Sequence, residues 1–84
     1  MKHAGAAAFD AVEDVLSAVR ARAELREKKP GIFYHKSTAF LHFHEDPAGL
    51  FADVKIGTAF ERLPVNTPEE RQALLDCVAA ALGD

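Results

Sequence analysis

The stretch Phe40–Ile56, FLHFHEDPAGLFADVKI, contains the pattern that decides the fold. Apolar and polar residues alternate on both sides of Asp46–Gly49, and alternation with a period of two is typical of strands that bury one face. The central DPAG offers an aspartate that can hydrogen-bond the turn backbone, a proline, and a glycine suited to a left-handed conformation. We therefore predict a β-hairpin in which Glu45 pairs with Leu50.

This register assigns every residue of the hairpin to one face of the sheet. Residues directly opposite each other in antiparallel strands share a face. The face expected to meet the helices carries the pairs Phe43 with Ala52, Leu41 with Val54, and Ala39 with Ile56. The opposite face, called the outer face below, carries the pairs His44 with Phe51, His42 with Asp53, and Phe40 with Lys55.

Two helices and two further strands are predicted around the hairpin. Apolar residues recur at spacings of three and four from Ala6 to Lys28, and Pro30-Gly31 would end such a helix. The run Thr67–Glu70, TPEE, has the residues of a capping box with proline at the first helical position. The expected elements are a helix at 6–28, strands at 31–36, 38–45, 50–56 and 60–63, and a helix at 68–82.

This order predicts one α+β domain over residues 1–84. We expect a two-layer sandwich, ordered helix, antiparallel meander of three or four strands, and helix, with both helices on one face of the sheet. A chain of 84 residues supplies enough apolar surface for one core and too little for two. With 49% hydrophobic and 27% charged residues, its composition is that of a folded chain rather than a disordered one.

Charge and cysteine content narrow the classes of partner. The formal net charge is −3 and the basic residues of 20–29 are interleaved with acidic ones, so a nucleic-acid partner is disfavoured. No uncharged apolar run approaches the roughly 18 residues of a membrane helix, and we expect no membrane partner. The single cysteine, Cys77, cannot form an internal disulfide, which favours a cytoplasmic location.

The outer face is the candidate functional surface. The flanking hairpins are expected to place Phe33 beside Phe40 with His35 nearby, Phe60 beside Lys55, and Arg62 beside Asp53 on this face. Several aromatic rings then lie together, and an apolar patch with a polar rim is typical of an interface or a ligand groove. The candidate binding residues are Phe33, His35, Phe40, His42, His44, Asp53, Lys55, Phe60 and Arg62. We expect self-association or another protein as the partner, ahead of a small ligand, with a non-enzymatic role preferred and no cofactor.

The pair His42 and His44 raises a second hypothesis, a metal site. A spacing of two places both imidazoles on one face of a strand, and Asp53 or His35 could supply a third ligand. The sequence alone ranks this below the alternative that these are half-exposed strand histidines.

A His-dependent enzyme is the related alternative. His42 and Asp53 could form an oriented general base, with Arg62 holding an anionic group. No nucleophile completes it, because Ser37 and Thr38 fall in a turn and Cys77 on an apolar helix stripe. A cross-strand ion pair ranks ahead of it. Aromatic residues on a sheet are also a feature of RNA-binding modules, but the charge makes this the least favoured function.

Overall fold

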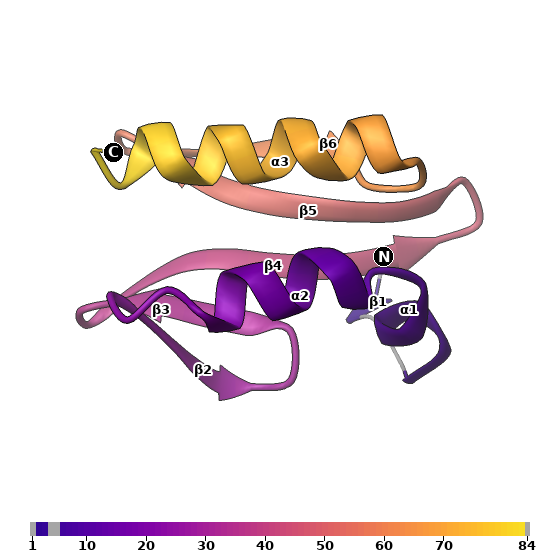
Figure 1. Cartoon of the computed structure of the whole chain (residues 1–84), viewed down its shortest axis with the longest axis horizontal. Helices are drawn as coiled ribbons and strands as arrows, with labels where there is room; N and C mark the ends of the chain where they lie inside the picture. Colours follow the sequence, from indigo (N-terminus) through magenta and orange to yellow (C-terminus); the bar gives the residue numbers. More distant parts are fainter. Residues whose placement is uncertain (1, 4–5, 84) are drawn as a thin grey trace.

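The computed structural model describes residues 2–3 and 6–83 (Figure 1). In this part of the chain the strands form a six-stranded antiparallel sheet in the order β2-β3-β4-β5-β6, with β1 paired to β4. The elements are β1 (Lys2–His3), α1 (Ala6–Ala11), α2 (Glu13–Arg20), β2 (Leu25–Lys29), β3 (Ile32–His35), β4 (Thr38–Asp46), β5 (Gly49–Ile56), β6 (Ala59–Pro64) and α3 (Pro68–Ala81). The predicted α+β class with an antiparallel sheet is confirmed, whereas the prediction of three or four strands is wrong.

The central hairpin has the predicted register. Glu45 pairs with Leu50, and the ladder runs without interruption to the pair of Leu41 and Val54. At the turn, Asp46 Oδ1 accepts a hydrogen bond of 2.8 Å from the Ala48 N–H. The β5–β6 hairpin also follows the prediction, since two turn residues connect its strands and bring Lys55 opposite Phe60 and Asp53 opposite Arg62.

The predicted first helix at 6–28 is wrong in its second half. The chain forms two short helices, α1 and α2, and then the edge strand β2. Pro30 and Gly31 do not merely end a helix but turn the chain between β2 and β3, with Gly31 at a φ of 75°. Glu27 supports this turn by accepting hydrogen bonds from the Gly31 N–H at 2.9 Å and from Arg20 Nε at 2.8 Å. Residues 25–29 favour helix by intrinsic propensity, but pairing with β3 overrides that preference.

A bulge between β3 and β4 overturns the predicted placement of two phenylalanines. The turn pairs His35 with Thr38, but Phe33 pairs with Leu41 and not with Phe40, so β4 holds one extra residue at this point. A shift of one residue moves side chains to the other face of a sheet. Phe33 therefore shares the face of Leu41 and is 1% exposed, and Phe40, 5% exposed, belongs to the same core cluster. The prediction that both line the outer face is wrong.

The helices α2 and α3 lie on the same side of the sheet, where the core forms (Figure 1). The N-terminus of α3 has the predicted capping box, in which the Glu70 N–H donates to Thr67 Oγ1 at 3.1 Å and Glu70 Oε1 accepts from the Thr67 N–H at 3.1 Å. The core cluster consists of Val12, Val15, Leu16, Val19, Phe33, Phe40, Leu41, Phe43, Ala52, Val54, Val65, Leu74 and Val78. These contacts leave the outer face of β4, β5 and β6 facing away from the helices.

Candidate functional site

Three adjacent strands bring polar side chains together on the outer face. His42 on β4 lies opposite Asp53 on β5, which in turn lies opposite Arg62 on β6. His44 follows two residues after His42 and therefore has the same orientation on β4. The predicted row of His42, Asp53 and Arg62 is thus present, because the ladders among these three strands are regular.

Asp53 is the centre of this cluster. Its carboxylate is held by both ends of the Arg62 guanidinium, with Nε at 2.8 Å from Oδ1 and Nη2 at 3.0 Å from Oδ2. Such a bidentate pair fixes the plane of the carboxylate. The hydrogen bond from Arg62 lowers the pKa of Asp53 against a rise from burial, and the charge of Arg62, together with those of His44 and His42 in their protonated forms, lowers it further. The residue is 8% exposed and is held as a carboxylate anion beside the two histidines.

The two imidazoles turn their nitrogen atoms toward each other and toward Asp53. His42 Nδ1 lies 2.9 Å from His44 Nε2, and His44 Nε2 lies 3.1 Å from Asp53 Oδ2. The third side of the triangle, His42 Nδ1 to Asp53 Oδ2, is 4.0 Å. Three potential metal ligands, two imidazole nitrogens and one carboxylate oxygen, therefore lie close to one another. They are called the triad below.

His44 Nε2 is close to two potential hydrogen-bond partners at once, His42 Nδ1 and Asp53 Oδ2. An imidazole nitrogen has one in-plane position, which holds either a proton or a lone pair. If His44 Nε2 accepts from His42, its lone pair faces the carboxylate oxygen at 3.1 Å with no proton between them. If it carries a proton, that single N–H has to be shared between His42 and Asp53. A cation bound by all three atoms would satisfy every lone pair at once.

The spacing of the triad is compatible with a coordinated metal ion. Bonds of about 2.0–2.1 Å in tetrahedral geometry place neighbouring ligand atoms about 3.3–3.4 Å apart. The observed separations of 2.9, 3.1 and 4.0 Å lie on both sides of this value.

Apolar side chains surround the triad. The Phe60 ring lies 4.9 Å from the His42 ring, and Phe60 itself is 43% exposed. Ile32 lies opposite His42 and Phe51 opposite His44 in the ladders. The position of Phe51 follows from the predicted hairpin, but that of Ile32 depends on the bulge, which no local feature of the sequence signals.

The remaining candidate residues lie elsewhere. Phe33 and Phe40 are in the core, as described above, and the His35 ring packs edge-on against Phe40 at 6.0 Å. Lys55 is half-buried opposite Phe60. Of the two residues considered as a third metal ligand, the structure therefore favours Asp53 over His35, because Asp53 lies beside His42 and His44.

One further position was missed by the sequence reasoning. The strand β1 was not predicted, and it places His3 opposite His44 in the ladder. A two-residue strand has too little sequence to produce a recognisable alternation.

The cysteine that was considered as a nucleophile lies away from the triad. Cys77 lies on α3, on the other side of the sheet, and burial, followed by the charge of Glu61, raises the pKa of its thiol.

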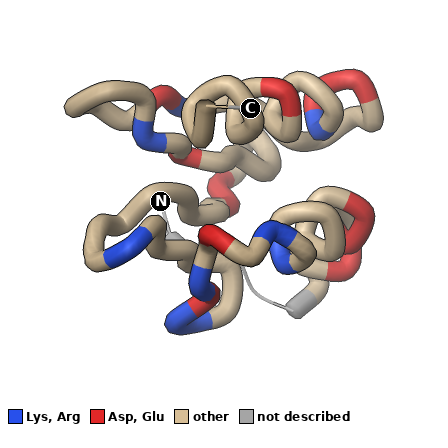
Figure 2. The backbone as a smooth tube through the Cα atoms, turned by 60° about the vertical axis from the view of Figure 1, so that its left-hand side comes forward, with Lys and Arg blue, Asp and Glu red and all other residues tan. Residues whose placement is uncertain are grey.

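Lys and Arg residues are interspersed with Asp and Glu along the backbone and form no continuous basic band in the described chain (Figure 2). The described helices are all too short or too polar to cross a membrane.

Comparisons with protein-family models, with curated proteins and with solved structures find no match to this chain. The geometry of the triad and its surroundings is therefore the basis for assigning a function to this chain.

Proposed function

We propose that this domain binds a divalent first-row transition metal ion, with zinc as the reference, through His42 Nδ1, His44 Nε2 and Asp53 Oδ2. The observation that carries the proposal is the close approach of these three atoms, which lie 2.9, 3.1 and 4.0 Å apart. Two imidazoles and one carboxylate suit zinc and its first-row neighbours, whereas magnesium and calcium prefer sites made of oxygen atoms only.

The surroundings support an ion that keeps an open coordination position. We take the domain to be a two-layer sandwich whose helices occupy one sheet face and therefore do not cover the triad on the other face. Three protein ligands leave at least one position for water or an external donor group, as in catalytic zinc sites. Arg62 would orient the Asp53 carboxylate from behind and supply a positive charge near any anion bound to the metal.

The competing explanation is an ion-pair network that holds three strands together and binds nothing. In that case Arg62, Asp53 and His44 form a cross-strand cluster whose only role is structural. The two explanations differ in their response to metal, because a purely structural network gains nothing from zinc.

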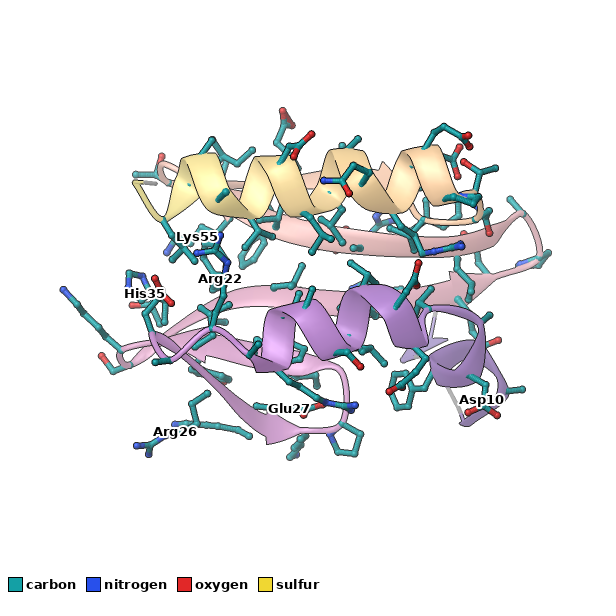
Figure 3. All side chains as sticks on the ribbon, viewed as in Figure 1. Asp10, Arg22, Arg26, Glu27, His35 and Lys55 are labelled. Carbon is teal, nitrogen blue, oxygen red and sulfur yellow. The ribbon has the colours of Figure 1, made fainter. Side chains whose placement is uncertain are left out.

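The test is a zinc titration of tag-free protein, followed by NMR of the histidine side chains. We expect saturable shifts for His42 and His44 at micromolar zinc, while His35 serves as an internal reference because it lies outside the triad. Asp53→Asn should weaken binding by at least ten-fold, since it removes the anionic ligand. Asp10→Asn is the matched control, because Asp10 is an exposed aspartate on α1 (labelled in Figure 3) that does not belong to the triad, and this variant should bind as the wild type does. Unchanged His42 and His44 signals in the wild type would rule the metal site out.

A second candidate function is self-association through the β5–β6 hairpin. Phe60 and Ile56, on the two strands of this hairpin, are 43% and 42% exposed. Exposed apolar side chains beside an open edge strand favour an interface, and a domain of this size would gain stability from one. Sedimentation equilibrium of the wild type and of Phe60→Asp tests this candidate, and a monomer in both cases would exclude it.

A further inference from the structure

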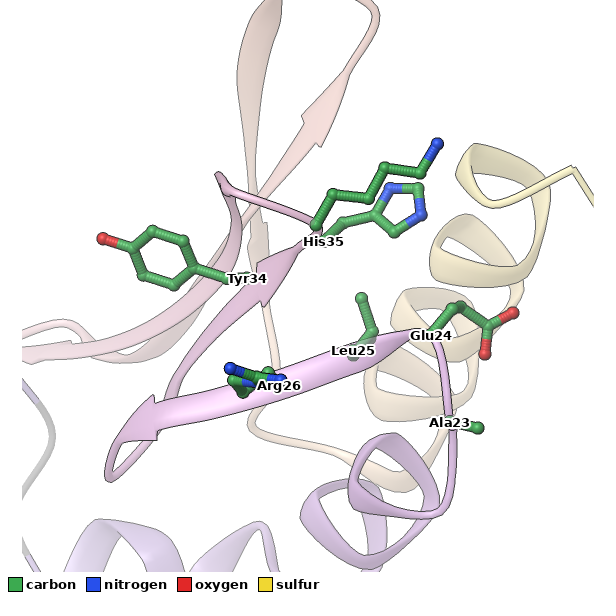
Figure 4. Close-up of a pocket in the computed structure, with 7 residues that line it drawn as sticks. Ala23, Glu24, Leu25, Arg26, Tyr34 and His35 are labelled. Atoms are coloured by element: carbon green, nitrogen blue, oxygen red, sulfur yellow. The ribbon is translucent and has the colours of Figure 1, made fainter.

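A second candidate binding region lies at the end of the molecule where the β3–β4 turn, the end of β5 and the end of α3 meet. A cavity of about 470 Å³ opens there, and its lining includes His35, Lys36, Ser37, Phe40, Lys55 and Ala81. Figure 3 shows Lys55 and His35 at this end of the molecule. A neighbouring cavity of about 500 Å³ shares His35 and Lys36, and Figure 4 shows that His35 and Tyr34 project to opposite sides of β3.

Two lysines carry the charge of the described residues that line the 470 Å³ cavity. Lys36 and Lys55 contribute their ammonium groups, and none of the aspartates and glutamates that the structure describes lines it. Within the described residues neither lysine forms an ion pair, in contrast to Arg20, Arg62 and Arg71, which each contact a carboxylate. Two unpaired cations facing one cavity, in a chain with a net charge of −3, favour an anionic ligand.

The backbone at Lys36 gives an independent reason to assign a role to its side chain. Lys36 has a φ of 61°, and the other described residues with positive φ are glycines. Glycine would adopt this conformation without the cost that a side chain imposes. Residues kept in a strained conformation are concentrated at binding sites. The lysine side chain at this turn projects beside the cavity that it lines.

Part of the cavity lining is apolar. Phe40 is 5% exposed and packs against the His35 ring, and Ala81 contributes only a methyl group from α3. The site thus combines two ammonium groups, a hydroxyl from Ser37 and a hydrophobic wall. Lysine is a common ligand of phosphate groups, and an aromatic wall suits a planar or hydrocarbon substituent.

We propose that the cavity lined by Lys36, Lys55 and Phe40 binds a small phosphate monoester that carries an apolar or aromatic group. The two lysines bind the phosphate oxygens, and the substituent packs against Phe40. This site is separate from the triad and requires no metal, so each proposal can fail without the other.

The experiment is a titration with phenyl phosphate in the presence of EDTA, followed by amide NMR shifts and calorimetry. We expect saturable shifts at residues 35–38 and 55–57, with weaker binding of inorganic phosphate, which lacks the ring, and of benzoate, which has a single negative charge. Lys55→Gln and Lys36→Gln should each weaken binding by about ten-fold, because each removes one charge-assisted hydrogen bond. Lys29→Gln, on the edge strand β2 and outside the cavity lining, is the matched control and should bind phenyl phosphate normally.

The lysines could instead only complement the C-terminal end of α3. In that case phenyl phosphate would produce no saturable shifts at millimolar concentration, or the Lys55→Gln and Lys29→Gln variants would bind it equally. Either result would overturn the proposal. Equal affinity for benzoate and phenyl phosphate would reject the phosphate assignment and indicate a general carboxylate site.

Discussion

Two hairpins share the strand β4, and they differ in the regularity of their ladders and in their turn residues. The β4–β5 ladder is regular from Leu41 to Asp46, and its turn has an aspartate and a glycine at the positions that need them. The β3–β4 ladder is interrupted by a bulge, and its turn places a lysine at a positive φ. The regular hairpin carries the triad, and the bulged one forms part of the wall of the 470 Å³ cavity that Lys36 and Lys55 line.

The difference shows which force determines register when two forces disagree. In the β4–β5 hairpin the turn residues and the apolar alternation specify the same pairing. In the β3–β4 hairpin the turn would pair Phe33 with Phe40 on the outer face, which would expose two large rings. The bulge at Phe40 instead places both rings in the core with Leu41. Burial of apolar area therefore prevails over regular pairing, at the cost of one ladder position.

The largest expected effect tests this placement of Phe40. Phe40→Ala should lower the free energy of unfolding by about 3–5 kcal/mol, since the ring is 5% exposed and its removal leaves a cavity in the core. Phe60→Ala, the matched control at 43% exposure, should cost about 1 kcal/mol or less. Urea unfolding followed by circular dichroism measures both. Equal losses in the two variants would show that Phe40 does not belong to the core.

The comparison of the two hairpins also shows which parts of the fold could be predicted from the sequence. The capping box at Thr67 and the turn at Asp46 are local signals, and the structure follows both. The strand β2 and the bulge depend on contacts between distant residues, because Leu25–Lys29 acquires its strand conformation only by pairing with β3. Asp53 and Arg62 could be placed beside His42 since every ladder between them is regular. His35 and Phe33 could not be placed, since one extra residue in β4 reverses their face.

The next largest effect concerns the triad on the regular hairpin. Zinc at about one hundred times its dissociation constant should stabilise the fold by about 2.7 kcal/mol, which raises the Tm of a domain of this size by about 10 °C or more. Magnesium at the same concentration should leave the Tm unchanged, and EDTA should reverse the effect of zinc. Because imidazole binds metal only when neutral, the stabilisation should disappear in acid. A thermal scan that is the same with and without zinc would contradict the metal site.

A smaller effect is expected from the ion pair of Asp53 and Arg62. The hydrogen bond from Arg62 holds the pKa of Asp53 below the ordinary value of 3.8. Asp53 therefore binds a proton more readily in the unfolded chain than in the folded one. The resulting stability is fully present well above pH 3.8 and is lost as the pH falls through the lowered pKa of the folded state.

We therefore expect the difference in unfolding free energy between the wild type and Asp53→Asn to shrink as the pH is lowered through this range. Urea unfolding in EDTA at a series of pH values provides the measurement, with Asp10→Asn as the control that should track the wild type. Half of the Arg62 side chain is exposed, so solvent limits the size of the effect, and high salt should reduce it. A difference that does not vary with pH would mean that the ion pair contributes nothing to folding.

The smallest expected effect has the opposite sign and concerns the bulged hairpin. Lys36→Gly should stabilise the fold by about 0.5–1 kcal/mol, because glycine relieves the left-handed backbone at φ 61° and this gain exceeds the extra flexibility of the unfolded chain. Ser37→Gly at the neighbouring turn position, whose φ is not positive, should destabilise it slightly, since only the flexibility of the unfolded chain changes. Chemical unfolding of both variants separates the two effects. If both glycines destabilise equally, Lys36 is not strained, and the lysine needs no functional reason to occupy the turn.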